Sequence, residues 1–248
     1  MSNSSTCVGW NHILGPACCL PSSDALPVTY TDDVRLISSS REKQTSSPTT
    51  WSVSLPTTEQ PKWAPQQRPR HNGRVFRYVP HHATQRDPDQ AAVDGTHAQR
   101  EGGRWNPPGS FPVLYTSCTE AVAIANLRRR YRGSPFQPWE LDESDQPDLY
   151  DLDVDQDRLV DALSDIGLDG IGLPPTYPDH VGHGVTQPIG ARLHGETYAG
   201  VWCRSAADRT GEEIALFVNE GHAATPTVAG SARRLWEWFP VPDEWKPS

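Results

Sequence analysis

Hydrophobic positions follow no regular period in the first part of the chain and recur regularly in the rest. From about Pro27 to Arg70 the residues are mainly Ser, Thr, Pro and Gln, and such segments contain too little apolar surface to form a packed core. We therefore expect residues 1–72 to form a disordered leader, residues 73–225 a folded domain, and residues 226–248 a tail.

Strand and helix patterns follow one another through the folded part. Residues 74–79 alternate as a strand does, and the polar residues 80–101 predict a loop. Residues 112–117 predict a second strand. Thr119 is a suitable N-cap for a helix over residues 120–130, where apolar side chains recur at helical spacing.

An acidic segment, residues 140–157, carries nine carboxylates and no basic residue. It superficially resembles a calcium loop, but Gln156 and Ala162 stand where that loop needs a glycine and a bidentate glutamate. The period-two alternation of residues 150–154 predicts a strand instead, followed by a helix from residue 155 or 156 to about residue 166.

Residues 186–198 predict another helix, with Pro188 in the first turn, where proline is tolerated. Residues 200–205 and 213–218 predict two strands of a hairpin-like pair.

The tail carries large aromatic side chains among prolines: Trp236, Trp238, Phe239 and Trp245. Such side chains dock on their own domain or on a partner. Docking on the domain is the commoner outcome, so we expect the tail to pack there.

The charge balance narrows the class of partner. A formal net charge of -9 argues against a general nucleic-acid binder, because neutralising phosphates requires clustered lysine and arginine. The basic run Arg128–Arg130 is explained by the end of a helix, where cations complement the helix dipole; an anion-binding patch is the alternative.

Five cysteines, an odd number scattered over the chain, make a poor disulfide framework and favour a reducing cytoplasm. No apolar run approaches the length that crosses a membrane, and the start lacks the features of a secretory signal. Cys7, His12, Cys18 and Cys19 do not have a familiar zinc-ligand spacing, so we expect no metal.

The segment Gly102–Asn106, Gly-Gly-Arg-Trp-Asn, offers the most specific chemistry. Paired glycines let a backbone approach a ligand closely, and the guanidinium of Arg104 supplies a planar fork of donors suited to phosphate oxygens. The alternative is that Arg104 only braces the loop.

The order of these motifs resembles the RES domain, which is named for an Arg, a Glu and a Ser and occurs in bacterial toxins of toxin-antitoxin pairs. The resemblance covers roughly residues 74–219. It rests on the strand around Arg77, the Gly103–Asn106 loop, the strand Leu114–Thr116 before a helix, and the late segment Gly200–Ser205 with the apolar run that follows it.

The resemblance implies an α+β fold similar to the ADP-ribosyltransferases, a compact mixed sheet with flanking helices. It also implies a pocket for NAD, which known members degrade by hydrolysis or phosphorolysis. It implies that Arg104 pairs with the pyrophosphate, that Tyr115 packs against nicotinamide or its ribose, and that Ser205 orients that ribose or the acceptor. Arg77 matches a second recurrent arginine, and Gly103 and Trp105 would line the same pocket. The implied partners are NAD, inorganic phosphate and an antitoxin protein.

One position departs from the family pattern. The family glutamate, eleven residues after the tyrosine, is Asn126 here, and an amide can hold a ribose hydroxyl but brings no negative charge to an oxocarbenium-like state. Glu196, Glu212 or Glu213 could reach the pocket from another element. The open alternatives are an NAD glycohydrolase or phosphorylase, a weakened domain that binds NAD, ADP-ribose or a protein, and an enzyme that transfers ADP-ribose to a protein.

Overall fold

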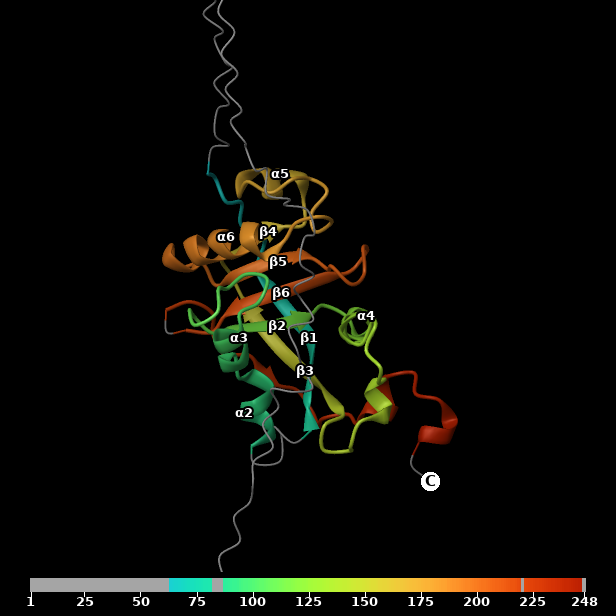
Figure 1. Ribbon diagram of the computed structural model, residues 1–248. Helices are drawn as coiled ribbons and strands as arrows, with labels where there is room; N and C mark the ends of the chain where they lie inside the picture. The colour runs from blue at the N-terminus through green and yellow to red at the C-terminus, as the bar shows by residue number, and fades with distance from the viewer. Residues whose placement is uncertain (1–62, 82–86, 220, 247–248) are drawn as a thin grey trace, which may run out of the picture. The chain divides into compact units, whose positions relative to one another are not determined.

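The computed structural model describes residues 63–81, 87–219 and 221–246 of the 248-residue chain (Figure 1). Most of the predicted leader, and the cysteines and histidine considered as zinc ligands there, lie outside the described residues. In the described part no helix is long and apolar enough to cross a membrane.

A mixed sheet forms the centre of the domain. In spatial order its strands are β4 (Leu159–Ala162), β5 (Gly200–Arg204), β6 (Glu212–Phe217), β2 (Val113–Ser117), β1 (His71–Pro80), β3 (Pro147–Gln156) and β7 (Thr227–Val228). The pairing of β4 with β5 is parallel and the other pairings are antiparallel. The predicted α+β class with a mixed sheet is confirmed.

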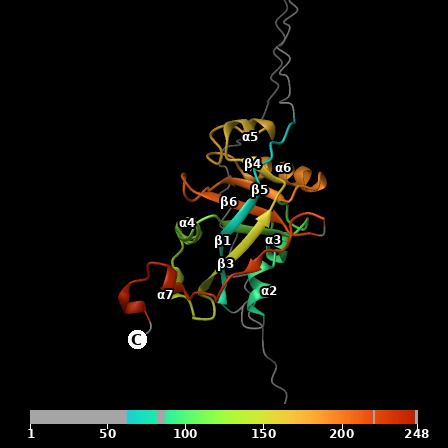
Figure 2. The same ribbon diagram turned by 180° about the vertical axis from the view of Figure 1, so that it is seen from behind.

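Helices flank this sheet. They are α2 (Pro88–Val93), α3 (Thr96–Glu101), α4 (Glu120–Arg130), α5 (Asp165–Gly170), α6 (His183–Gly195) and α7 (Leu235–Trp238), with short 3-10 turns at Pro138–Glu140 and Asp243–Trp245. Figures 1 and 2 show α5 and α6 beside β4 and β5, with α4 on the opposite side of the molecule from α2 and α3.

The two faces of the sheet bury different side chains because residues alternate along each strand. Ala215 and Phe217 of β6 join the cluster under α5 and α6, whereas Ile214 and Leu216 join a second cluster with Val75 of β1. A third cluster contains the inner side of α4 and the tail helix α7. The register that pairs Phe76 with Ser117 places α4 and α6 over the same face.

Several predicted elements are confirmed. The helix over residues 120–130 is α4, and the hydroxyl of Thr119 accepts a hydrogen bond from the Val122 N–H at 3.3 Å. The acidic segment forms β3, in which Leu152 and Val154 are buried while Asp153 is exposed.

Three predictions were wrong. Residues 80–101 are not a single loop, since they contain α2 and α3. Pro188 lies inside α6 and not in its first turn, because the helix begins at His183. Residues 155–166 do not form a helix: β4 occupies the middle of this range, and a short apolar run does not distinguish a buried strand from a helix. Arg158, with φ of 57°, makes the turn that separates β3 from β4.

Residues 63–70 run along the outer edge of β4. Arg68 N–H donates to the Leu159 carbonyl at 2.9 Å, and Asp161 N–H donates to the Gln66 carbonyl at 2.8 Å. The side chain of Trp63 lies under the guanidinium of Arg192 at 3.9 Å. This part of the segment assigned to the leader therefore covers an edge strand whose backbone would otherwise be unpaired. The exact boundary between leader and domain stays a prediction.

The tail contributes to the core of the domain. Leu235, Trp238 and Phe239 are nearly buried in the third cluster, and the Trp238 ring stacks on Tyr78 of β1 with a centroid distance of 6.2 Å. Trp245 by contrast is 50% exposed.

We predict that Trp238→Ala lowers the free energy of unfolding by about 3–5 kcal/mol, because it leaves a large cavity beside Tyr78. Trp245→Ala is the matched control and should change it by no more than about 0.5 kcal/mol. Urea unfolding followed by circular dichroism measures both. Equal effects of the two substitutions would show that the tail does not pack as described.

Candidate functional site

The Gly-Gly-Arg-Trp loop is held by very close packing. A Cβ atom on Gly103 would lie 2.4 Å from the Tyr115 hydroxyl oxygen, and one on Gly190 of α6 would lie 1.8 Å from the Trp105 carbonyl oxygen. Neither position accepts a side chain without movement of the loop. The glycine that the sequence marked for close approach to a ligand is therefore needed for close approach to Tyr115.

Tyr115 braces this loop from β2. Its hydroxyl accepts a hydrogen bond from the Trp105 N–H and donates one to Asn106 Oδ1, each at 2.8 Å. Burial raises the pKa of the Tyr115 hydroxyl above its ordinary value, so the group stays a neutral donor. Asn106 is itself buried and donates to the carbonyls of Ala98 and Phe111.

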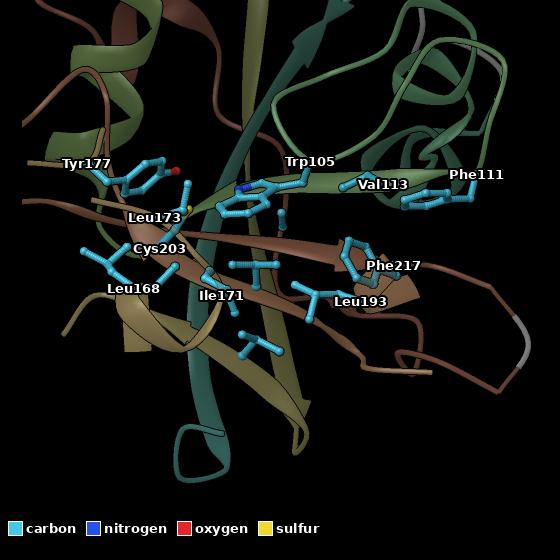
Figure 3. Packing of buried hydrophobic residues seen from close by; sticks show 14 residues of the cluster. Trp105, Phe111, Val113, Leu168, Ile171, Leu173, Tyr177, Leu193, Cys203 and Phe217 are labelled. Carbon is cyan, nitrogen blue, oxygen red and sulfur yellow. The ribbon is translucent and has the colours of Figure 1, made fainter. Parts of the chain in front are cut away.

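Trp105 belongs to the hydrophobic core. Its side chain is fully buried, and its ring lies 5.9 Å from that of Tyr177. Figure 3 shows it in the middle of the cluster, between Tyr177 on one side and Val113 and Phe111 on the other. It anchors the loop, and the structure does not bring it to a surface where a ligand could touch it.

Arg104, next to the buried Trp105, is half-buried. One guanidinium nitrogen donates to the Val181 carbonyl at 3.3 Å, and the group lies 5.9 Å from the centroid of the Tyr177 ring. The backbone around it is fixed by α6, where Thr186 and Gln187 donate to the carbonyls of Arg104 and Gly103. No carboxylate of the described residues lies within 4 Å of the guanidinium, so most of its donors are free for an anion.

A second polar group gathers on the same face of the sheet, around Glu213 of β6. Glu213 Oε1 accepts hydrogen bonds from Ser205 Oγ at 2.5 Å and from Asn126 Nδ2 at 2.9 Å. The Asn126 amide also donates to Ser117 Oγ at 3.3 Å. Asn126, at the position of the family glutamate, therefore points at a carboxylate that comes from another strand.

Ser205 is fully buried behind this carboxylate. Besides donating to Glu213, its hydroxyl oxygen accepts from the N–H groups of Ala207 and Asp208 at 3.1 and 3.2 Å. The serine caps the turn after β5 and holds Glu213, and the structure leaves its hydroxyl no exposed surface for direct contact with a substrate.

Arg104 and Glu213 both lie next to buried side chains of the core. The Arg104 guanidinium is 5.9 Å from the centroid of the Tyr177 ring, and Glu213 is the cross-strand partner of Cys203. Burial raises the pKa of the Cys203 thiol to about 12; the charge of Glu213 raises that pKa further and the charge of Arg104 lowers it. The same two charges act in the same directions on the pKa of Tyr177, which burial raises well above its ordinary value. A cation and a carboxylate thus lie near the same buried groups, on one face of the sheet.

Helices α6 and α4 contribute one further residue each near the site. Burial lowers the pKa of His183, at the start of α6, and the nearby charges of Arg104 and Arg129 lower it further. Arg129 of α4 donates to the Ala206 carbonyl, next to Ser205. The basic run at the end of α4 therefore has one member that reaches the site.

Arg204 holds the loop before α6 in place. Its guanidinium donates to the carbonyls of Leu163, Pro175 and Tyr177 and to the carboxylate of Asp165. The loop that carries Tyr177 and Val181 toward Arg104 is thereby tied to the end of β5.

Arg77 is not brought to this site. It lies on the face of β1 that carries Val75 and Val79, and its guanidinium donates to the carbonyls of Ala92 and Asp94, each at 2.8 Å. Burial lowers its pKa to about 10, which leaves the group charged at neutral pH. The structure uses Arg77 to join β1 to α2, and nothing in its contacts supports a role in cofactor binding.

Of the three candidate glutamates, Glu213 is the one that contacts Ser205 and Asn126. Glu212 points to the opposite face, where its carboxylate accepts from Trp202 Nε1 at 2.8 Å, and Glu196 pairs with Arg192 and Trp63 at the far edge of the sheet. The sequence could have identified Glu213, because alternate residues of a strand share a face and Ala215 and Phe217 of β6 face α6. No sequence pattern marked Tyr177 or His183 as neighbours of the site.

One hollow lies at the start of α4. A cavity of about 390 Å³ is lined by Cys118, Thr119, Val122, Asp208 and Glu212 and includes neither Arg104 nor Glu213. Within the described ranges, no three His, Cys, Asp or Glu side chains are grouped as metal ligands would be.

Comparison with known proteins adds a family and a fold. The model of the RES domain family matches residues 74–237. The crystal structure of the M. tuberculosis MbcT-MbcA toxin-antitoxin complex contains a chain with a TM-score of 0.53 to this one at 18% identity, over 69% of this chain and 90% of that chain. At this identity the likeness shows the fold alone. No curated protein matches the chain.

We predict that Tyr115→Phe lowers the free energy of unfolding by about 1–3 kcal/mol, because it leaves the Trp105 N–H and Asn106 Oδ1 without a partner. Tyr198→Phe is the control, since its hydroxyl makes no hydrogen bond within the part of the chain that the structure describes. Chemical unfolding of both variants measures the difference, and a loss no greater than that of the control would contradict the bracing role.

Proposed function

Because the chain belongs to the RES domain family, we propose that it consumes NAD by cleaving the bond between nicotinamide and ribose, with water or inorganic phosphate as the acceptor. In functional terms it would be a glycohydrolase or a phosphorylase, and it would act as the toxin of a toxin-antitoxin pair in a reducing cytoplasm. The match over residues 74–237 supports the family's general chemistry for this chain.

The observation that carries this proposal is the separation of charges on one face of the sheet. Among the described residues Arg104 has no carboxylate partner and Glu213 has no cationic partner. The Arg104 guanidinium lies 5.9 Å from the centroid of the Tyr177 ring, and Glu213 pairs across the strands with Cys203. Such an arrangement suits a ligand that is negative at one end and positive at the other. NAD has this form, with an anionic pyrophosphate and a cationic nicotinamide ring.

Arg104 would hold the pyrophosphate. A guanidinium presents parallel N–H donors that match two phosphate oxygens, and such charge-assisted pairs are among the stronger hydrogen bonds in proteins. Its backbone is fixed by α6 and by Tyr115, so little conformational entropy is lost when a ligand binds. Tyr115 then serves the site by positioning Arg104, and direct packing of its ring on nicotinamide is secondary.

An antitoxin is the proposed protein partner. The fold neighbour was solved as a toxin-antitoxin complex, and this supports a partner of the same kind here. A small antitoxin encoded in the neighbouring reading frame, co-purifying with this chain and abolishing its toxicity, is the expected finding.

A second candidate function is binding of NAD or ADP-ribose without turnover. Asn126 favours it, because an amide replaces the carboxylate that the family places at this position. The two functions differ in one observable: release of free nicotinamide.

We predict that the full-length protein releases nicotinamide from NAD and that Arg104→Met lowers kcat/KM about tenfold to a hundredfold, the loss expected when a charge-assisted hydrogen bond is removed. Arg100→Met, on the exposed last turn of α3, is the matched control and should retain wild-type activity.

Chromatographic measurement of nicotinamide, with and without phosphate in the buffer, gives both rates and identifies the acceptor. A wild-type protein that binds NAD and releases no nicotinamide would reject the enzyme and support the binding function.

A further inference from the structure

We propose that Glu213 supplies the catalytic carboxylate of this site from strand β6, in place of the glutamate that Asn126 replaces on α4. The proposal rests on the proposed function, cleavage of NAD, and assigns its missing acidic group. It follows from the contacts of Glu213, which only the pairing of distant strands reveals.

The two oxygens of the Glu213 carboxylate are used differently. Oε1 accepts from both Ser205 Oγ and Asn126 Nδ2, whereas Oε2 has no hydrogen-bond donor within the described ranges. Two donors on one oxygen fix the plane of the carboxylate and leave the other oxygen available. The group is half-buried, so its charge acts in a medium less polar than water.

Asn126 and Glu213 together fill the role of a single acidic group. Their side chains are 2.9 Å apart at Nδ2 and Oε1, so a carboxylate at either position would occupy nearly the same region. A glutamate at both positions would place like charges in contact, which disfavours ionisation of one of them. The amide of Asn126 avoids this repulsion and donates a hydrogen bond to the carboxylate of Glu213.

The carboxylate suits the charge that develops during cleavage. The bond between ribose C1′ and the nicotinamide nitrogen breaks, and its electron pair leaves with the nicotinamide, which becomes neutral. Positive charge then appears on C1′ and the ring oxygen of the ribose, and Glu213 Oε2 stabilises it electrostatically. An oxygen of water or phosphate forms the new bond to C1′; when the acceptor is water, its proton is lost to solvent.

Ser205 is a positioning residue in this scheme. Its buried hydroxyl contacts Glu213 at 2.5 Å and cannot reach a substrate, so its effect on the reaction passes through that carboxylate. Ser205→Ala should therefore slow the wild-type protein but change the rate little once Glu213 has been replaced by Gln.

The first test compares Glu213→Gln with Glu212→Gln in the full chain. Glutamine keeps an acceptor for Ser205 and Asn126 and removes only the charge, so we expect kcat to fall by at least about a hundredfold while the protein stays folded. Glu212, the next residue, faces the other side of the sheet, and its substitution should leave kcat within about twofold of wild type.

The second test moves the carboxylate across the 2.9 Å contact. In the double variant Asn126→Glu with Glu213→Gln, the acid and the amide exchange places, and we expect at least a tenfold recovery of kcat over Glu213→Gln alone. Recovery cannot come from a merely structural role of Glu213. It also keeps the proposal testable if the single variant folds poorly.

The outcomes separate this inference from the proposed function. Turnover by wild type with undiminished turnover by Glu213→Gln would overturn the role of Glu213 and leave NAD cleavage standing, and so would a large loss without recovery in the exchanged variant. No turnover by wild type would overturn both.

Discussion

The register between β2 and β6 is the constraint on which the site depends. It pairs Tyr115 with Ala215 and Ser117 with Glu213, so the brace of the Arg104 loop and the carboxylate face the same helices. A shift of one residue would turn Glu213 to the opposite face and bring Glu212 in its place. Buried side chains on both faces of β6, Ile214 and Leu216 on one and Ala215 and Phe217 on the other, oppose such a shift.

The rest of the site is built on this pairing by contacts that leave little freedom. Tyr115 bonds to the loop backbone, Gly190 lets α6 approach the Trp105 carbonyl, and Ser205 holds Glu213 from the turn after β5. The two charged groups are therefore positioned before any ligand arrives. A site prepared in this way stabilises developing charge without first reorganising its own dipoles.

Sequence patterns were sufficient where the signal is local. The Thr119 cap, the alternation in β3 and the Gly-Gly-Arg-Trp loop depend on near neighbours in the chain, and each has a counterpart in the structure. The family resemblance drew attention to Arg104, Tyr115, Asn126 and Ser205. The structure joins Tyr115 to the loop that carries Arg104, and it joins Asn126 and Ser205 to Glu213. Their roles toward NAD stay predictions.

Sequence patterns were insufficient where an element or a contact depends on residues that are distant in the chain. Strand β4 was expected to be helical, because nothing local shows that residues 63–70 and β5 flank it. The hydrogen bonds that Arg77 donates to the carbonyls of Ala92 and Asp94 were likewise not visible in the sequence, and its expected role in cofactor binding stays a prediction. Glu213 was one of three candidates. The alternation along β6 separates it from Glu212, but its contacts with Ser205 and Asn126 appear only once distant strands are paired.

The most direct test of the account is a crystal structure of the Glu213→Gln variant with NAD, since this variant should bind the dinucleotide and cleave it slowly. The account predicts intact NAD on the face of the sheet under α4 and α6, with pyrophosphate oxygens at the Arg104 guanidinium and the nicotinamide ribose against residue 213. NAD bound elsewhere, or bound with its adenosine end at residue 213, would contradict it.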